Sequence, residues 1–243
     1  MELLEQFEMV TNLEKGTELS LNLCDNEYLF KVRENKVIVE IMRGGETERR
    51  IFGVSFPVEV VVRPYTIGDI YLLRPLEPIA VYPKTKIDLF FAVPYIIRVI
   101  LKENNKRFST VDEVNIHSIK KVWYGINFEE GYLAIDVPVK SSDSPSNQDF
   151  YANLPITISN RYENVVNVSK IPLFTDDLIF YICSNNLFLS KVNFNIVGRE
   201  EATVSVKDVP RKDCVKVISV KDTTTTPLLK DILKTGRRVI WGF

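Results

Sequence analysis

Histidine is almost absent from this sequence of 243 residues, in which His117 is the only one. Metal centres usually draw on several histidine or cysteine ligands, and Ser-His-Asp or Cys-His nucleophiles need a histidine base. No GxSxG turn occurs, and the neighbours of His117 (VNIHSIKK) predict the surface of a strand. The sequence therefore predicts no catalytic residues and no metal ligands.

Glycine is also scarce, with 10 residues, and neither a Walker-type loop nor a GxGxxG turn is present. Glycine-rich loops are what bring backbone amides close to the phosphates of a nucleotide. No EF-hand calcium loop occurs either. We therefore expect no cofactor and predict no cofactor-binding residues.

The three cysteines, Cys24, Cys183 and Cys214, are far apart, odd in number and without CxxC spacing. Such usage argues against a disulfide framework and favours a reducing compartment. The N-terminal sequence MELLEQFEMVTNLEKG contains acidic residues and no apolar core, unlike a signal peptide. These two features together predict a cytoplasmic protein.

The charge balance argues against nucleic-acid binding, and the lengths of the apolar stretches argue against a membrane-spanning helix. The chain has 31 basic and 32 acidic residues, whereas nucleic-acid binding usually requires a basic excess or patch. The most apolar stretch, Leu89–Leu101, contains Pro94 and Arg98 and is shorter than the roughly 20 residues of a spanning helix. It predicts two buried strands or one bent strand, so we expect neither nucleic-acid binding nor a transmembrane segment.

What the sequence does contain is β-strand pattern. Val, Ile, Phe, Tyr and Thr alternate with polar residues in short runs, and turn residues such as Gly44-Gly45 and Asn185-Asn186 separate these runs. The pattern predicts a mainly β fold, an antiparallel β-sandwich or a barrel-like architecture. The predicted strands include Glu18–Leu23, Lys36–Met42, Pro57–Val62, Lys86–Phe91, Tyr132–Val139, Leu178–Cys183, Leu187–Ile196, Ala202–Lys207 and Val215–Val220.

Two helices are predicted. Leu3–Asn12 is one candidate, with an ordered or frayed chain end as the alternative. Thr226–Thr235 is the better one, with a capping threonine, Pro227 at its first position and Gly236 after its end. The short C-terminal helix has one apolar face, which we expect to pack on a sheet. The final residues Arg238–Phe243 are mostly apolar and predict a buried strand or an interface.

The chain length allows two domains, and the polar residues near 108 suggest a boundary there. This predicts an N-terminal β domain, residues 1–107, and a C-terminal β domain, residues 108–243, that ends in the short helix. A single domain is the alternative. Ser141–Asp149 (SSDSPSNQD) predicts a mobile loop.

A few side chains stand out without defining a site. Trp123 and Tyr124 are adjacent, as are Phe150 and Tyr151, and such pairs serve either as core or as platforms for sugars or peptides. Arg74 and Glu77 lie among prolines, where a surface ion pair is the plain interpretation. Three adjacent acid pairs predict turns or exposed ends, because neighbours on a strand face opposite ways. These pairs are Glu129-Glu130, Asp176-Asp177 and Glu200-Glu201.

One region resembles a known family. The segment Asp69–Ile100 (DIYLLRPLEPIAVYPKTKIDLFFAVPYIIRVI), with its Pro75–Pro78 element and Pro83, is similar to an archaeal family catalogued as domain of unknown function 432. Lys121–Gly125 (KVWYG) and Trp241–Phe243 also resemble its pattern, so the resemblance covers about Glu27 to Phe243. It implies an archaeal, intracellular β protein, and it implies no activity and no site residues.

Absent catalytic motifs and abundant apolar strands together favour a non-enzymatic β protein that works by protein–protein binding or by self-assembly into a closed oligomer. The alternative is a carboxylate-dependent enzyme, or a binding module, that acts on a carbohydrate or a similar polar small molecule. The enzyme would need two acids from different strands to face each other across an aromatic-lined pocket. The binding module would need an open aromatic platform.

Overall fold

The structure is a computed structural model that describes residues 5, 7, 10–104, 107–125, 131–146, 148–207, 210, 213–217 and 237–240. The described chain is mainly β, as the sequence predicts, with helical backbone at residues 5 and 7 and a short 3-10 turn at Thr175–Asp177. It divides into two compact units, residues 1–64 with 97–114 and residues 65–96 with 115–243. That residues 1–107 and 108–243 fold as separate domains stays a prediction.

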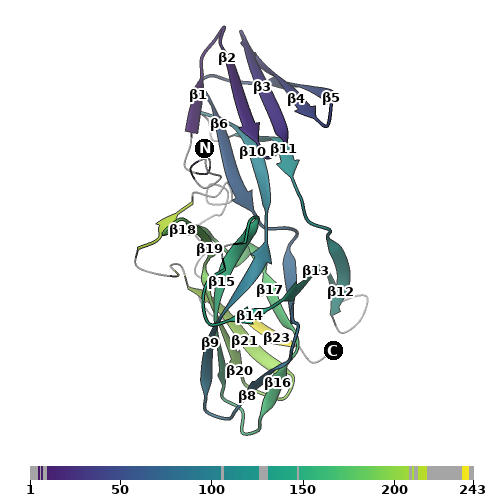
Figure 1. Ribbon diagram of the computed structural model, residues 1–243, viewed down its shortest axis with the longest axis vertical. Coiled ribbons are helices and arrows are strands. Elements are labelled where there is room, and N and C mark those ends of the chain that lie inside the picture. The colour runs from purple at the N-terminus through teal and green to yellow at the C-terminus, as the bar shows by residue number, and fades with distance from the viewer. Residues whose placement is uncertain are drawn as a thin grey trace. The chain divides into compact units, whose positions relative to one another are not determined.

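Unit 1 is built from two four-stranded sheets (Figure 1). One has the order β2-β3-β4-β5, a meander in which every pair is antiparallel. The other has the order β1-β6-β10-β11. The strands are β1 Val10–Leu13, β2 Glu18–Leu23, β3 Asn26–Arg33, β4 Lys36–Arg43, β5 Glu46–Gly53, β6 Val58–Tyr65, β10 Ile96–Glu103 and β11 Phe108–Val114.

A buried polar network joins these two sheets inside unit 1. The side chain of Asp112 on β11 is 6% exposed, and it accepts hydrogen bonds from Tyr28 Oη at 2.7 Å and from Arg43 Nη2 at 2.5 Å. Arg50 Nη1 lies 3.7 Å from Asp112 Oδ1, and Arg43 Nε donates to Asn26 Oδ1 at 2.9 Å. The basic hairpin of β4 and β5 is therefore anchored to the core as well as solvated.

Unit 2 contains a nine-stranded sheet, a four-stranded sheet and a two-stranded pair, β16-β8. Antiparallel pairs predominate, but β13–β7, β15–β19 and β15–β20 are parallel. Its strands are β7 Ile70–Pro75, β8 Ile79–Val81, β9 Lys86–Pro94, β12 Lys120–Gly125, β13 Gly131–Val139, β14 Ser141–Ser142, β15 Tyr151–Asn160, β16 Val166–Val168, β17 Ile171–Phe174, β18 Phe180–Cys183, β19 Asn186–Leu189, β20 Lys191–Ile196, β21 Glu201–Lys207, β22 Val215–Lys216 and β23 Arg237–Ile240.

Several local predictions are confirmed. Gly44 and Gly45 form the β4–β5 turn with φ of +58° and +85°, a conformation that favours glycine. Strands β18 and β19 form the second expected hairpin. The apolar stretch Leu89–Leu101 forms two strands, β9 and β10. Asp176-Asp177 lies in the 3-10 turn, and Glu200 lies in a bend before β21.

Other local predictions are wrong or fall outside the described residues. His117 lies in the connection between β11 and β12 instead of a strand, and the predicted loop Ser141–Asp149 begins with strand β14. The helix predicted over Leu3–Asn12 holds at residues 5 and 7 but is wrong from Val10, where β1 begins. The predicted helix Thr226–Thr235 and the pair Glu129-Glu130 lie outside the described residues, whereas Arg237–Ile240 forms the predicted C-terminal strand.

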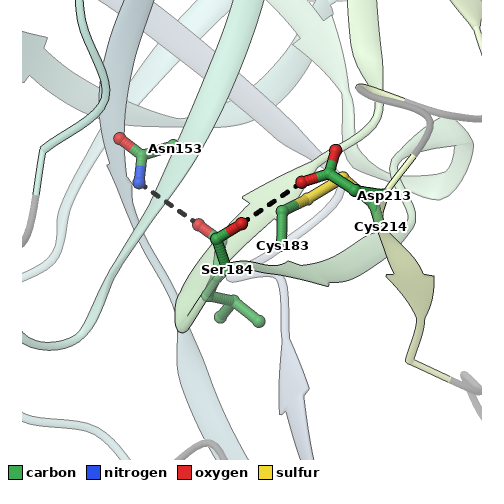
Figure 2. Close-up of a disulfide and its surroundings, with 6 residues drawn as sticks. Asn153, Cys183, Ser184, Asp213 and Cys214 are labelled. Carbon is green, nitrogen blue, oxygen red and sulfur yellow. Dashed lines mark hydrogen bonds between the residues drawn. A yellow bond between two sulfur atoms is a disulfide. The ribbon is translucent and has the colours of Figure 1, made fainter.

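The cysteines correct the prediction that no disulfide forms. A disulfide joins Cys183, at the end of β18, to Cys214, just before β22 (Figure 2). It therefore ties the edge strand β22 of the nine-stranded sheet to its neighbour β18. Ser184 Oγ donates a hydrogen bond to Asp213 Oδ2 at 3.2 Å beside the disulfide (Figure 2). The spacing of the two cysteines, 31 residues apart, does not reveal this pairing, because it depends on the long-range pairing of β18 with β22. Cysteine usage therefore no longer supports a reducing compartment.

In the part of the chain that the structure describes, no helix is long and apolar enough to cross a membrane.

Candidate functional site

The candidate site lies on the four-stranded sheet with the order β12-β13-β7-β17, here called the β7 sheet (Figure 1). Strand β12 is its edge, and among the described residues β13 is the only strand that pairs with it. Residues directly opposite each other across paired strands share a face. Even-numbered residues of all four strands therefore form one face, the Arg74 face, and odd-numbered residues form the other, the Trp123 face.

On the Arg74 face, a buried carboxylate is held by two cations. Arg74 Nε lies 2.8 Å from Asp136 Oδ1, and Arg74 Nη2 lies 2.7 Å from Asp136 Oδ2, a two-pronged pairing. Lys120 Nζ on β12 lies 3.8 Å from the same Oδ2. The side chain of Asp136 is 4% exposed, so these contacts tie the edge strand and β7 to the middle strand β13.

Apolar side chains continue this face toward the end of the hairpin at which Gly125 pairs with Gly131. Ile70, Leu72 and Ala134 are buried, and Val122, Tyr124 and Phe174 pack against them. Burial, and to a lesser degree the nearby Tyr132, raises the pKa of Tyr124 to about 12. Tyr124 therefore stays protonated in the neutral range and acts as an aromatic side chain with a hydroxyl group, not as a proton acceptor.

The Trp123 face is buried at its centre and exposed at its edge. Tyr71, Leu73 and Ile135 are at most 5% exposed. Trp123 and Leu133, directly opposite each other on β12 and β13, are 43% and 56% exposed. Large apolar side chains on paired strands at this edge are thus accessible to solvent, although the centre of the face is buried.

Tyr132 adds a third exposed side chain on the opposite face of the same hairpin. It is 56% exposed, and its ring meets that of Phe174 edge-on, with centroids 6.1 Å apart. The β12–β13 hairpin thus presents aromatic surface on both faces, with Lys120 and Lys121 exposed at the start of β12. We call Lys120–Gly125 together with Tyr132 and Leu133 the aromatic edge.

The structure therefore brings together three of the residues that stood out in the sequence. Arg74 on β7 and the pair Trp123-Tyr124 on β12 lie in the same sheet, separated by β13, and Tyr124 shares its face with Arg74. Glu77 does not join them, because it is exposed in the bend after β7 and Arg74 pairs with Asp136 instead. Sequence reasoning missed Asp136, Lys120, Tyr132 and Leu133. For the three residues on β13 the sequence signal is the alternation of polar and apolar residues in that strand, and for Lys120 on β12 there is none. The pairing of β12 with β13 must be known before these residues can be placed together.

The remaining candidates serve packing. His117 Nε2 lies 3.0 Å from the carbonyl oxygen of Phe150, and its ring meets Tyr151 edge-on at 4.9 Å. The ring of Phe150 lies 6.4 Å from that of Tyr95. Within the described residues, no group of three or more His, Cys, Asp or Glu side chains is placed to hold a metal ion.

Fold and site define a mainly β protein with an exposed aromatic strand edge. A family model described as "Protein of unknown function (DUF432)" matches residues 5–235, and the chain belongs to this family. The match extends further toward the N-terminus than the resemblance from Glu27 onward. No curated protein and no solved structure matches the chain.

Proposed function

We propose that this chain is a non-enzymatic protein that binds another polypeptide along the aromatic edge. The observation that carries the proposal is the exposure of Trp123 and Leu133, 43% and 56%, side by side on an edge hairpin. An edge strand offers a row of backbone donors and acceptors that an added strand can satisfy. Side chains beside that row then select the partner.

The composition of the aromatic edge fits this role. Tryptophan and tyrosine are the residues on which binding energy at protein interfaces most often concentrates, because they bury large areas with few rotatable bonds. Trp123, Tyr124 and Tyr132 lie within one hairpin, and Leu133 widens the apolar area around Trp123. A partner strand beside β12 would cover much of this surface.

The ion pairs behind the edge keep it in place before a partner arrives. Asp136 is buried and is contacted by Arg74 from β7 and by Lys120 from β12. These contacts reduce the freedom of the edge strand. A surface that is ordered in advance loses less entropy on binding than a flexible one.

The chemistry of Asp136 is a poor match for the enzymatic alternative. A carboxylate enzyme needs two acidic side chains that face each other and remain available to a substrate. At this site the buried carboxylate is engaged on both oxygens by cations. A sugar platform would use the exposed Trp123 as well, and the experiment below separates it from a polypeptide-binding edge.

The test is native mass spectrometry on protein purified without added ligand, with Trp123→Ala beside the unsubstituted chain. Tyr82→Ala is the matched control, because Tyr82 is 63% exposed and lies outside the β7 sheet. We expect a complex with a second polypeptide that Trp123→Ala weakens at least about tenfold and Tyr82→Ala leaves unchanged. A monomer that carries a reproducible small-molecule adduct would contradict the proposal and favour the binding module or enzyme.

A further inference from the structure

The sequence of β12 is complementary to itself. The strand begins with two cations, Lys120 and Lys121, has Val122 next, and continues with two aromatic residues, Trp123 and Tyr124. If two copies of this strand run antiparallel, the cationic half of each lies beside the aromatic half of the other. A cation over an aromatic ring is attracted by the negative face of the ring.

We propose that the polypeptide bound at the aromatic edge is β12 of a second copy of this chain, paired antiparallel about a twofold axis at Val122. This inference rests on the proposed function and names its partner. The two four-stranded β7 sheets would then continue through one shared pair of edge strands. A twofold contact of this kind is closed, because each copy uses the same surface once.

The register follows from the positions of the side chains. With Val122 opposite its counterpart, Lys121 lies opposite Trp123 of the second copy, and Lys120 lies opposite Tyr124 of the second copy. Opposite residues share a face, so the first pair forms on the Trp123 face and the second on the Arg74 face. Twofold symmetry makes each pair occur twice.

Other registers satisfy fewer groups. An axis at Trp123 would place Lys121 opposite Gly125 and Val122 opposite Tyr124, which leaves this lysine without an aromatic partner. A parallel, in-register pairing would place lysine beside lysine, and like charges directly opposite are destabilising. The Val122 register alone among these brings both cations to aromatic rings.

Charge supports association with a second copy. Lysines at an exposed edge usually discourage unwanted pairing, because an incoming strand would have to bury them. Here Lys120 already lies 3.8 Å from Asp136, and Lys121 would rest its apolar stem on Trp123 of the second copy. The net charge of the chain is −1, so long-range repulsion between copies is weak.

The test is a charge exchange measured by sedimentation velocity over a concentration series. Lys121→Glu places a carboxylate beside the negative ring face of Trp123, and Trp123→Lys places two lysines opposite each other. We expect each variant alone to raise the dimer Kd at least about tenfold. An equimolar mixture restores one Lys–Trp pair and creates one Glu–Lys pair, so we expect it to dimerise within about tenfold of the unsubstituted chain.

Lys140→Glu is the matched control, because Lys140 is exposed and lies just after β13, away from β12. It should leave dimerisation unchanged, and circular dichroism verifies that each variant is folded. If Trp123→Lys does not fold, Trp123→Ala mixed with Lys121→Glu replaces it. This mixture restores one Lys–Trp pair without a Glu–Lys pair, so we expect partial recovery of dimerisation.

The outcomes separate this inference from the proposed function. A dimer that neither variant weakens overturns self-pairing of β12, because its interface lies elsewhere. A dimer that both variants weaken but the mixture does not restore overturns the register alone. An unsubstituted chain that stays monomeric overturns self-pairing, and the proposed function then stands only if native mass spectrometry finds a different polypeptide whose binding needs Trp123.

Discussion

Arg74 and Asp136 lie 62 residues apart in sequence and form a two-pronged ion pair, with both nitrogen–oxygen distances at or below 2.8 Å. The parallel pairing of β7 with β13 brings them to one face of the sheet. Arg74 is half exposed, with 48% of its side chain accessible, whereas Asp136 is 4% exposed. The carboxylate therefore depends on this pairing more than the guanidinium does.

Removal of Arg74 should destabilise the fold through the carboxylate that it leaves behind. Arg74→Ala leaves Asp136 buried, with the more distant Lys120 as its remaining ion-pair partner among the described residues, and we expect the free energy of unfolding to fall by about 1–3 kcal/mol. Lys191→Ala is the control, since its partner Asp88 is 60% exposed, and it should change stability by less than about 1 kcal/mol. Urea titration measures both, and equal effects would contradict a special role for the Asp136 pair.

Tyr28 should matter to unit 1 through its hydroxyl group. Its ring is fully buried, and the hydroxyl donates to the buried carboxylate of Asp112. Tyr28→Phe removes one donor while Arg43 still contacts the carboxylate, so we expect a loss of about 1–2 kcal/mol. Tyr82→Phe, at a 63% exposed tyrosine, should cost almost nothing. Chemical denaturation of both variants checks this, and an unchanged midpoint for Tyr28→Phe would refute the contribution of the hydrogen bond.

Two buried tyrosines should make the protein sensitive to alkaline pH. Burial raises the pKa of Tyr71 and of Tyr28 above the ordinary value, and the bond to Asp112 raises that of Tyr28 further. The stabilisation is complete below about pH 10, where unfolded tyrosine is also protonated, and it is lost as pH rises through the folded-state pKa. We expect unfolding free energy to fall above about pH 10 by about 1.4 kcal/mol per pH unit for each such tyrosine.

Tyr71→Phe isolates one of these contributions. The hydroxyl of Tyr71 accepts from the Ile67 amide at 2.7 Å and donates to the Pro94 carbonyl at 2.8 Å, so the variant should be less stable at neutral pH. Its stability should nevertheless fall less steeply above about pH 10, because one fewer proton is released on unfolding. Stability curves at several alkaline pH values measure the slope, and an unchanged slope would show that Tyr71 does not hold its proton.

The disulfide should contribute strongly to unit 2. Cys183 and Cys214 close a loop with a sequence separation of 31 residues, and a loop of this length restricts the unfolded chain by about 3–4 kcal/mol in the chain-entropy account. Cys183→Ser with Cys214→Ser should lower the melting temperature by several degrees, as should a reductant on the unsubstituted chain. Cys24→Ser, at an exposed free cysteine, should change little. A melting temperature indifferent to reductant would contradict the prediction.

The sequence predicts the strands well because alternation is a local property. The predicted strand Glu18–Leu23 has the same first and last residues as β2. The Gly44-Gly45 turn lies between two alternating runs, as predicted. His117 was misplaced because its neighbours have strand-like composition, whereas the chain there connects two sheets and is shaped by contacts with Phe150 and Tyr151.

The candidate site was only partly predictable, because its parts meet through strand pairing between distant segments. Trp123 and Tyr124 were noticeable as an aromatic pair, and Arg74 as a charge among prolines. Their common sheet depends on β13 pairing antiparallel with β12 and parallel with β7, and nothing local encodes that arrangement. The disulfide escaped notice for the same reason, since β18 and β22 become neighbours only in the folded chain.

The most direct test of the account is site-directed cross-linking at the proposed twofold axis. Val122→Cys in a Cys24→Ser background places two thiols opposite each other, since directly opposed residues of antiparallel strands have Cα atoms about 4.5–5.5 Å apart, within reach of a disulfide. Lys120→Cys in the same background is the control, because its position would face Tyr124 of the second copy. We predict a covalent dimer from Val122→Cys under mild oxidation and little from Lys120→Cys. No covalent dimer, or equal yields from both, would contradict pairing of β12 about Val122.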